Sequence, residues 1–149
     1  AIRRHREAGR KRLALVVQKG HVEVALGRHL EGLWLSQGEA RKRIIRHDRN
    51  DIEKLYRELI ELQPEGIVFS NWMPLPEEVW TRLGAPERAH PIALSLPEHA
   101  LGTMDGYHAS TATLALRAAH YLETRLSRAG YHAAYGRTLV HMEWTPMGR

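Results

Sequence analysis

The 149-residue chain contains no cysteine and no long uninterrupted apolar run. Without cysteine, disulfide bonds and thiolate metal sites are excluded. A membrane-spanning helix needs roughly 20 consecutive apolar residues, and no stretch approaches that length. The N-terminus is rich in arginine but lacks the apolar core of a signal peptide. We therefore expect a soluble protein.

The common catalytic and cofactor-binding motifs are also missing. There is no GxGxxG after the first apolar run, and no GxxxxGK[ST], GxSxG or HExxH anywhere. Dinucleotide-binding, P-loop, hydrolase and zinc-protease functions therefore lose their main support. The ten histidines are scattered, without the spacing of metal ligands. The sequence predicts no catalytic residue, no cofactor and no metal site.

Basic residues are concentrated at the start of the chain. The formal net charge is +5, and residues 1–12 hold six arginines and lysines against Glu7 alone. The remaining 16 basic and 16 acidic side chains cancel. A nucleic-acid-binding protein usually spreads its cations along a face. We interpret the cluster as a solvated helix face, with a phosphate-binding arm as the alternative.

Helix and strand patterns alternate along the chain. Short apolar runs bounded by turn residues predict strands at residues 13–17, 44–47, 67–69, 92–96 and 138–142. Apolar residues at helical spacing predict helices at residues 1–8, 22–37, 52–62, 76–83 and 108–128, and residues 101–107 are predicted to form a loop. The last helix has its predicted inner face at Ala112, Ala115, Leu116, Ala119, Leu122 and Leu126.

Two glycines interrupt the predicted helix at residues 22–37. Gly27 and Gly32 each disfavour a helix by roughly 1 kcal/mol relative to alanine. We therefore expect another part of the chain to approach closely there.

Strands that are unbroken apolar runs, alternating with helices, indicate a doubly wound α/β fold with a mostly parallel sheet and helices on both faces. No repeat or linker divides residues 1–149, so we expect a single domain. In such sheets ligands bind beyond the carboxyl ends of the strands. The polar residues predicted there are Gln18, Lys19, His47, Asp48, Ser70, Asn71, Trp72 and the segment 95–99.

The segment EGIVFSNWMPLP, residues 65–76, carries the most informative of these strand ends. Asn71 offers a donor and an acceptor, which match a sugar hydroxyl, and Trp72 can supply an apolar wall for a ring. Alternatively, Asn71 only turns the chain and Trp72 packs in the core. Composition leaves both interpretations open.

Several strings, in order, resemble the effector-sensing domain of LacI/GalR-type transcription regulators. AIRRHREAGRKRLALVV is similar to the segment that opens the C-terminal lobe in that family, and RHLEGLWLSQ is similar to its arginine-containing helix. PEGIVFSN resembles the strand that ends in the family's Asn-Asp pair. LGTMDGYHASTATLALRAAHYLETRL and RTLVHMEWTPMGR resemble the later loop and helix and the terminal strand.

The resemblance covers essentially the whole chain and implies a type I periplasmic-binding-protein-like half domain. It implies a small-molecule effector, such as a sugar, bound between two lobes, and a cytoplasmic homodimer. It also implies that DNA is bound only through a headpiece absent from this chain. The chain would then be a fragment that lacks the helix-turn-helix and the N-terminal lobe.

The resemblance also implies effector-binding residues. Asn71, which follows Ser70, stands where the family has its ligand-binding asparagine, and Trp72 replaces the aspartate that usually follows. His29 stands where the family has its effector-contacting arginine, with Arg28 one position earlier. The family's Gly-x-Asp-Asp is replaced by SLPEH, in which Glu98 is the nearby candidate.

Two other functions remain open. One is a solute-binding protein for uptake, and the other is an α/β enzyme acting on a small polar metabolite. For a dimer surface, Trp34, Leu35 and Trp80 are candidates, although each is equally compatible with the core.

Overall fold

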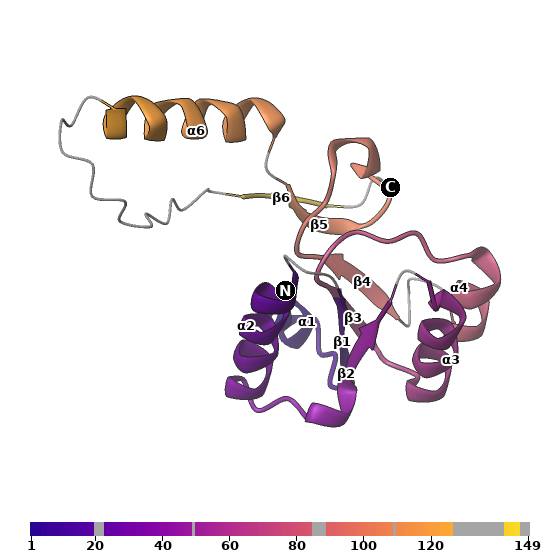
Figure 1. Cartoon of the computed structure of the whole chain (residues 1–149). Helices are drawn as coiled ribbons and strands as arrows, with labels where there is room; N and C mark the ends of the chain where they lie inside the picture. The colour runs from indigo at the N-terminus through magenta and orange to yellow at the C-terminus, as the bar shows by residue number, and fades with distance from the viewer. Residues whose placement is uncertain (20–22, 49, 85–88, 109, 127–141, 147–149) are drawn as a thin grey trace.

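The computed structural model describes residues 1–19, 23–48, 50–84, 89–108, 110–126 and 142–146. These residues form one six-stranded sheet with helices on both faces (Figure 1). The strands are β1 (Leu13–Gln18), β2 (Ile44–His47), β3 (Gly66–Phe69), β4 (His90–Ala93), β5 (Asp105–His108) and β6 (Glu143–Thr145). The helices are α1 (Ile2–Glu7), α2 (Glu23–Ser36), α3 (Ile52–Leu62), α4 (Glu77–Leu83) and α6 (Thr111–Leu126), with short 3-10 helices η1 (Arg41–Arg43) and η2 (Glu98–Ala100).

The strand order is β2-β1-β3-β4-β5-β6. Strands β1 to β5 are parallel, and β6 pairs antiparallel with β5. The chain goes from β1 outward to β2 and then crosses to β3 on the other side of β1. The order therefore reverses between β1 and β3, which is where such folds bind ligands. The predicted doubly wound, mostly parallel fold is confirmed.

Two apolar layers, one on each face of the sheet, explain the unbroken apolar run of β1. Ala14 and Val16 pack in the larger core, with side chains of α3 and α4. Leu13, Leu15 and Val17 pack on the other face, in the cluster that contains Trp34 of α2. Successive strand residues point to opposite faces, so a strand covered on both sides is apolar throughout. Trp34 is only 1% exposed and therefore belongs to the core rather than to a dimer surface.

The predicted close approach is confirmed at Gly27 and wrong at Gly32. A Cβ atom at Gly27 would lie 2.8 Å from Val17 Cγ1, so α2 sits directly on β1 at this point. A Cβ at Gly32 would meet nothing within 4 Å. Only the first glycine is explained by packing.

The predicted loop at residues 101–107 is wrong in its second half, because β5 begins at Asp105. This strand lacks the apolar run that marks the others. A Cβ at Gly106 would lie 3.0 Å from Ala93 O, so the glycine allows β5 to approach β4. The strand predicted at residues 92–96 begins earlier, at His90. The strand predicted at 138–142 falls almost entirely outside the described residues.

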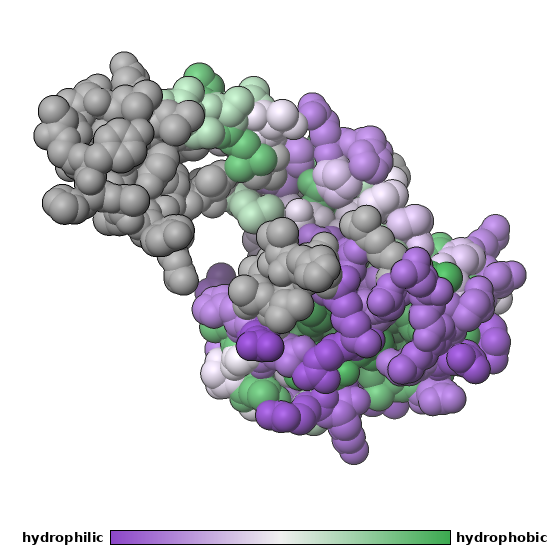
Figure 2. Space-filling view, viewed as in Figure 1, coloured by the Kyte–Doolittle hydropathy of each residue, from purple (hydrophilic) through white to green (hydrophobic). Residues whose placement is uncertain are grey.

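Helix α6 begins and ends close to its predicted bounds, but it does not pack as predicted. Residues 127 and 128 of the prediction lie outside the described residues. Figure 1 shows α6 extending away from the sheet, and Figure 2 shows apolar residues, in green, on its surface. Leu116 is 72% exposed and Leu114 is 44% exposed, and Ala112, Ala115 and Ala119 are exposed as well. The predicted inner face is therefore wrong for these residues, and the side chains of Leu122 and Leu126 lie outside the described part.

No helix in the described ranges is long and apolar enough to cross a membrane.

The basic N-terminal segment is only partly a solvated helix face. His5 is fully buried, and Arg6 forms an ion pair with Glu39, whose side chain is only 4% exposed. The guanidinium carbon of Arg4 lies 3.8 Å from the centre of the Trp144 ring. Much of α1 therefore anchors to the sheet and to the loop before β2.

Candidate functional site

Polar side chains from β1 and β3 meet where the strand order reverses. Gln18 ends β1, and Ser70 and Asn71 follow β3. The backbone N–H of Gln18 donates to Ser70 Oγ at 3.2 Å, and Asn71 Nδ2 donates to Gln18 Oε1 at 3.5 Å. Ser70 is buried, whereas Asn71 is half-buried. The structure thus places an amide group, held by its neighbours, at the ligand-binding edge of the fold.

The backbone explains why Ser70 sits at this edge. Its N–H donates to Val16 O at 2.9 Å, which extends the β1–β3 ladder by one residue beyond Phe69. The strand therefore ends its apolar run at Phe69 but keeps its direction for another residue. Asn71 follows directly, and its half-buried side chain lies beside Gln18 at the end of β1.

Trp72 links the end of β3 to the segments that follow β4. Its backbone N–H donates to Ser95 O at 2.8 Å, and its indole N–H donates to Thr103 Oγ1 at 3.1 Å. The His99 ring stands edge-on to the indole, with 5.2 Å between ring centroids. Trp72 is half-buried and packs against the larger core. Trp72 thus packs on the core, and its role as a wall for a ligand ring stays a prediction.

A cavity of about 560 Å³ opens beside this tryptophan. It lies between the segment after β4 and the start of α6, and its lining includes Ser95, Glu98, His99, His108, Leu114 and Met142. His108 Nδ1 lies 2.9 Å from Leu96 O, and a carbonyl oxygen only accepts, so Nδ1 carries a proton. In the neutral ring Nε2 is then an acceptor. The Glu98 carboxylate is a second acceptor, and the lining residues Ser95 and Thr111 carry hydroxyls that can donate or accept, so the cavity suits a ligand with hydroxyl groups.

The predicted site residues are not all brought together. Ser70, Asn71 and Trp72 are consecutive at the edge, and Glu98 lies in the cavity wall close to the Trp72–His99 contact. Arg28 and His29 are exposed on α2 and make no hydrogen bond or ion pair to these residues within the described ranges. Their predicted role stays a prediction.

Three residues of this edge carried weaker sequence signals. Gln18 is visible as the polar residue after the first apolar run, but nothing local pairs it with Asn71. Thr103 and His108 were missed. Thr103 lies in the segment that was predicted to be a loop, and His108, which ends β5, was predicted to begin the last helix. Among the described residues no group of three or more potential metal ligands occurs.

The architecture places the chain in a known class of fold. It is an α/β lobe of the kind found in the effector-binding domain of LacI-type regulators. In particular, it is similar to the crystal structure of the transcription regulator CcpA of Lactococcus lactis, with a TM-score of 0.62 and 13% sequence identity. The match covers 96% of this chain and 58% of that chain.

The similarity confirms the fold that the sequence resemblance implied. At this identity it shows the fold alone, and this chain spans little more than half the length of the similar structure. No protein-family model matches the chain, and no curated protein sequence is significantly similar to it.

Proposed function

We propose that this chain is the effector-sensing lobe of a LacI-type transcription regulator, which binds a small hydroxyl-bearing molecule such as a sugar. The observation that carries the proposal is the amide pair of Gln18 and Asn71 at the strand-order reversal. The cavity bounded by Glu98 and His108 adds a second binding surface at the same edge. The shared fold with a transcription regulator supports the regulatory role.

The mechanism follows from differential binding. In the complete protein a second lobe would close over the carboxyl edge, and the effector would bind more tightly to the closed than to the open arrangement. A ligand shifts such an equilibrium only through this difference in affinity. Asn71 contributes by donating a hydrogen bond to a ligand hydroxyl or accepting one from it, while the Trp72 ring provides an apolar contact for one side of the ligand.

The proposal includes a homodimer acting in the cytoplasm on DNA. The DNA contacts belong to a headpiece elsewhere in the complete protein, and the dimer passes the effector-induced change to it. Exposed apolar side chains support self-association, because Leu114 and Leu116 on α6 and Leu33 on α2 remain uncovered in the single chain.

Effector-dependent operator binding tests the proposed function. The full-length protein is assayed for release or capture of operator DNA in the presence of a panel of sugars and polyols. We expect at least one compound to change operator affinity, and Asn71→Ala to weaken that response. The matched control is Gln37→Ala, which removes an exposed amide directly after the C-terminal end of α2. A response equal in both variants contradicts the site assignment.

A half-site is expected to bind poorly by itself. Small-molecule sites usually bury most of the ligand surface, and one lobe provides only one wall. Calorimetry on residues 1–149 should therefore show weak or no heat of binding with the compound that the full-length protein recognises. Micromolar binding to this chain alone would show that the second lobe is not needed.

A further inference from the structure

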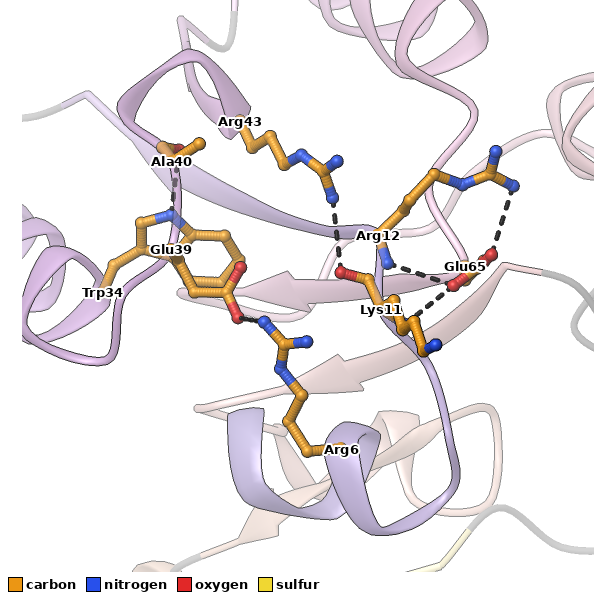
Figure 3. Close-up of polar contacts among 8 residues, drawn as sticks. All are labelled: Arg6, Lys11, Arg12, Trp34, Glu39, Ala40, Arg43 and Glu65. Carbon is orange, nitrogen blue, oxygen red and sulfur yellow. Dashed lines mark hydrogen bonds and ion pairs between the residues drawn. The ribbon is translucent and has the colours of Figure 1, made fainter.

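Cationic side chains gather at the amino-terminal edge of the sheet, opposite the candidate effector site. Residues 10–12 lead into β1, and η1 leads into β2. Because β1 and β2 are parallel, both segments lie at the same edge. Arg43 Nη1 donates to Lys11 O at 3.5 Å and joins them (Figure 3). The basic edge consists of Arg10, Lys11, Arg12, Arg41, Lys42 and Arg43.

The basic edge carries a high local charge. Its six cations, less the charge of Glu65 that contacts them, give +5, which equals the formal net charge of all 149 residues. The other 16 basic and 16 acidic residues cancel. The basic edge is therefore strongly cationic.

Glu65 shows how the basic edge binds a carboxylate. Its Oε2 accepts the backbone N–H groups of Lys11 at 2.7 Å and Arg12 at 3.0 Å, and Oε1 lies 3.3 Å from Arg12 Nη2 (Figure 3). The N–H of Arg12, followed by that of Lys11, holds the pKa of Glu65 below its usual value. Successive backbone N–H groups of this kind form a concave site for anions. The loop is thus fixed in a shape that suits carboxylates.

Several cations of the basic edge keep their charge available. Lys11, Arg41 and Lys42 are exposed and form no ion pair with a described acidic residue. A cavity of about 650 Å³ lies beside the part of the basic edge that precedes β1, and its lining includes Arg10, Lys11, Arg12, Gln63, Pro64 and Glu65. Because Glu65 already orders the loop, a second carboxylate would meet cations whose backbone is held in place, which lowers the entropic cost of binding.

We propose that the basic edge is a docking surface for a short acidic segment of another protein. The carboxylates of that segment bind the exposed cations in the way that Glu65 binds Arg12. Guanidinium groups match carboxylates in paired geometry. Adjacent strands lie about 4.8 Å apart, so the edge from β2 to β3 spans only roughly 10 Å and fits a few residues of a peptide.

The same observations disfavour a nucleic acid. No aromatic side chain is interleaved among residues 10–12 or 41–43, as expected for single-stranded nucleic acid. The docking surface also lies at the opposite end of the strands from Asn71. The test of acidic-peptide docking is therefore independent of the proposed effector function.

Fluorescence anisotropy with a fluorescein-labelled oligoglutamate peptide tests the proposal on this chain. We expect binding that weakens as salt is added, because exposed charges are screened. The double variant Lys11→Glu/Lys42→Glu should lose at least about tenfold in affinity, since each exposed pair contributes modestly and reversal turns attraction into repulsion. Both side chains are exposed, so unchanged urea unfolding is expected to show that the fold is intact.

The matched control is Lys54→Glu/Arg57→Glu on α3, which changes the net charge by the same amount at exposed positions away from the basic edge. This variant should keep most of the affinity. An equal loss in both double variants would show that net charge rather than the basic edge drives binding. No peptide binding by the unaltered chain also overturns the proposal. Tighter binding of duplex DNA that is lost in Lys11→Glu/Lys42→Glu would assign the edge to nucleic acid instead.

Discussion

Replacing His5 by phenylalanine should make the stability of the protein less sensitive to acid. His5 is fully buried, and its Nε2 has no hydrogen-bond partner among the described residues. Burial, followed by the nearby Arg10 and His90, lowers the pKa of His5 from 6.5 to about 4. The folded protein therefore keeps the ring neutral at a pH where the unfolded chain protonates it.

The direction and the size of the change in unfolding free energy with pH follow from the difference in proton binding between the folded and unfolded chain. A histidine with a lowered folded pKa leaves stability intact above the unfolded pKa of 6.5, and stability is lost as pH falls toward about 4. At pH 5 the gap to the unfolded pKa is about 1.5 units, so about 2 kcal/mol of unfolding free energy should be lost between pH 7 and pH 5. The His5→Phe variant lacks this loss.

Urea unfolding followed by tryptophan fluorescence at pH 7 and pH 5 measures the effect. All other titrating groups are common to both proteins, so the difference between their two pH dependences isolates His5. We expect the wild-type protein to lose about 2 kcal/mol more than His5→Phe over this range. Equal losses would refute the argument, because they would mean that buried His5 is protonated without penalty.

Two close packing contacts give further stability predictions. Gly27→Ala should destabilise the protein by about 1–3 kcal/mol, because its Cβ would lie 2.8 Å from Val17, whereas Gly32→Ala in the same helix should stabilise it by up to about 1 kcal/mol. Chemical denaturation measures the unfolding free energy of both variants. Equal changes in the two variants would contradict the close contact between Gly27 and Val17. Gly66→Ala should also destabilise by about 1–3 kcal/mol, because its Cβ would lie 2.5 Å from His5 Nδ1. Adding His5→Ala should then relieve part of that loss, and strictly additive effects would show that the two sites do not touch.

The sequence predicted the order of the elements well where each strand is an apolar run. Leu13 to Val17 are apolar throughout, and in the structure this run packs into apolar clusters on both faces of the sheet. Strand β5 carries no such signal, because Gly106 allows it to approach β4 closely and Asp105 contacts His90 of β4 through a polar contact, His90 Nε2 to Asp105 Oδ2 at 2.7 Å. The orientation of α6 was equally hidden, since helical spacing marks an apolar face but not what covers it.

The candidate site was predictable in part for a similar reason. Asn71 follows an apolar strand, so its position at the carboxyl edge could be predicted from the local pattern. Its pairing with Gln18 depends on β1 and β3 being neighbours, and strand order is set by long-range packing. The cavity beside His108 depends on β5, which the local pattern did not reveal.

The affinity of the effector for the full-length protein tests the central claim most directly. Calorimetry is performed with the compound that the operator assay identifies, on the wild-type protein, Asn71→Ala and the control Gln37→Ala. Loss of one hydrogen bond of about 1 kcal/mol or slightly more should raise the Kd of Asn71→Ala roughly five- to tenfold. The control should match the wild-type protein. An unchanged Kd in Asn71→Ala would contradict the assignment of the effector site to the carboxyl ends of β1 and β3.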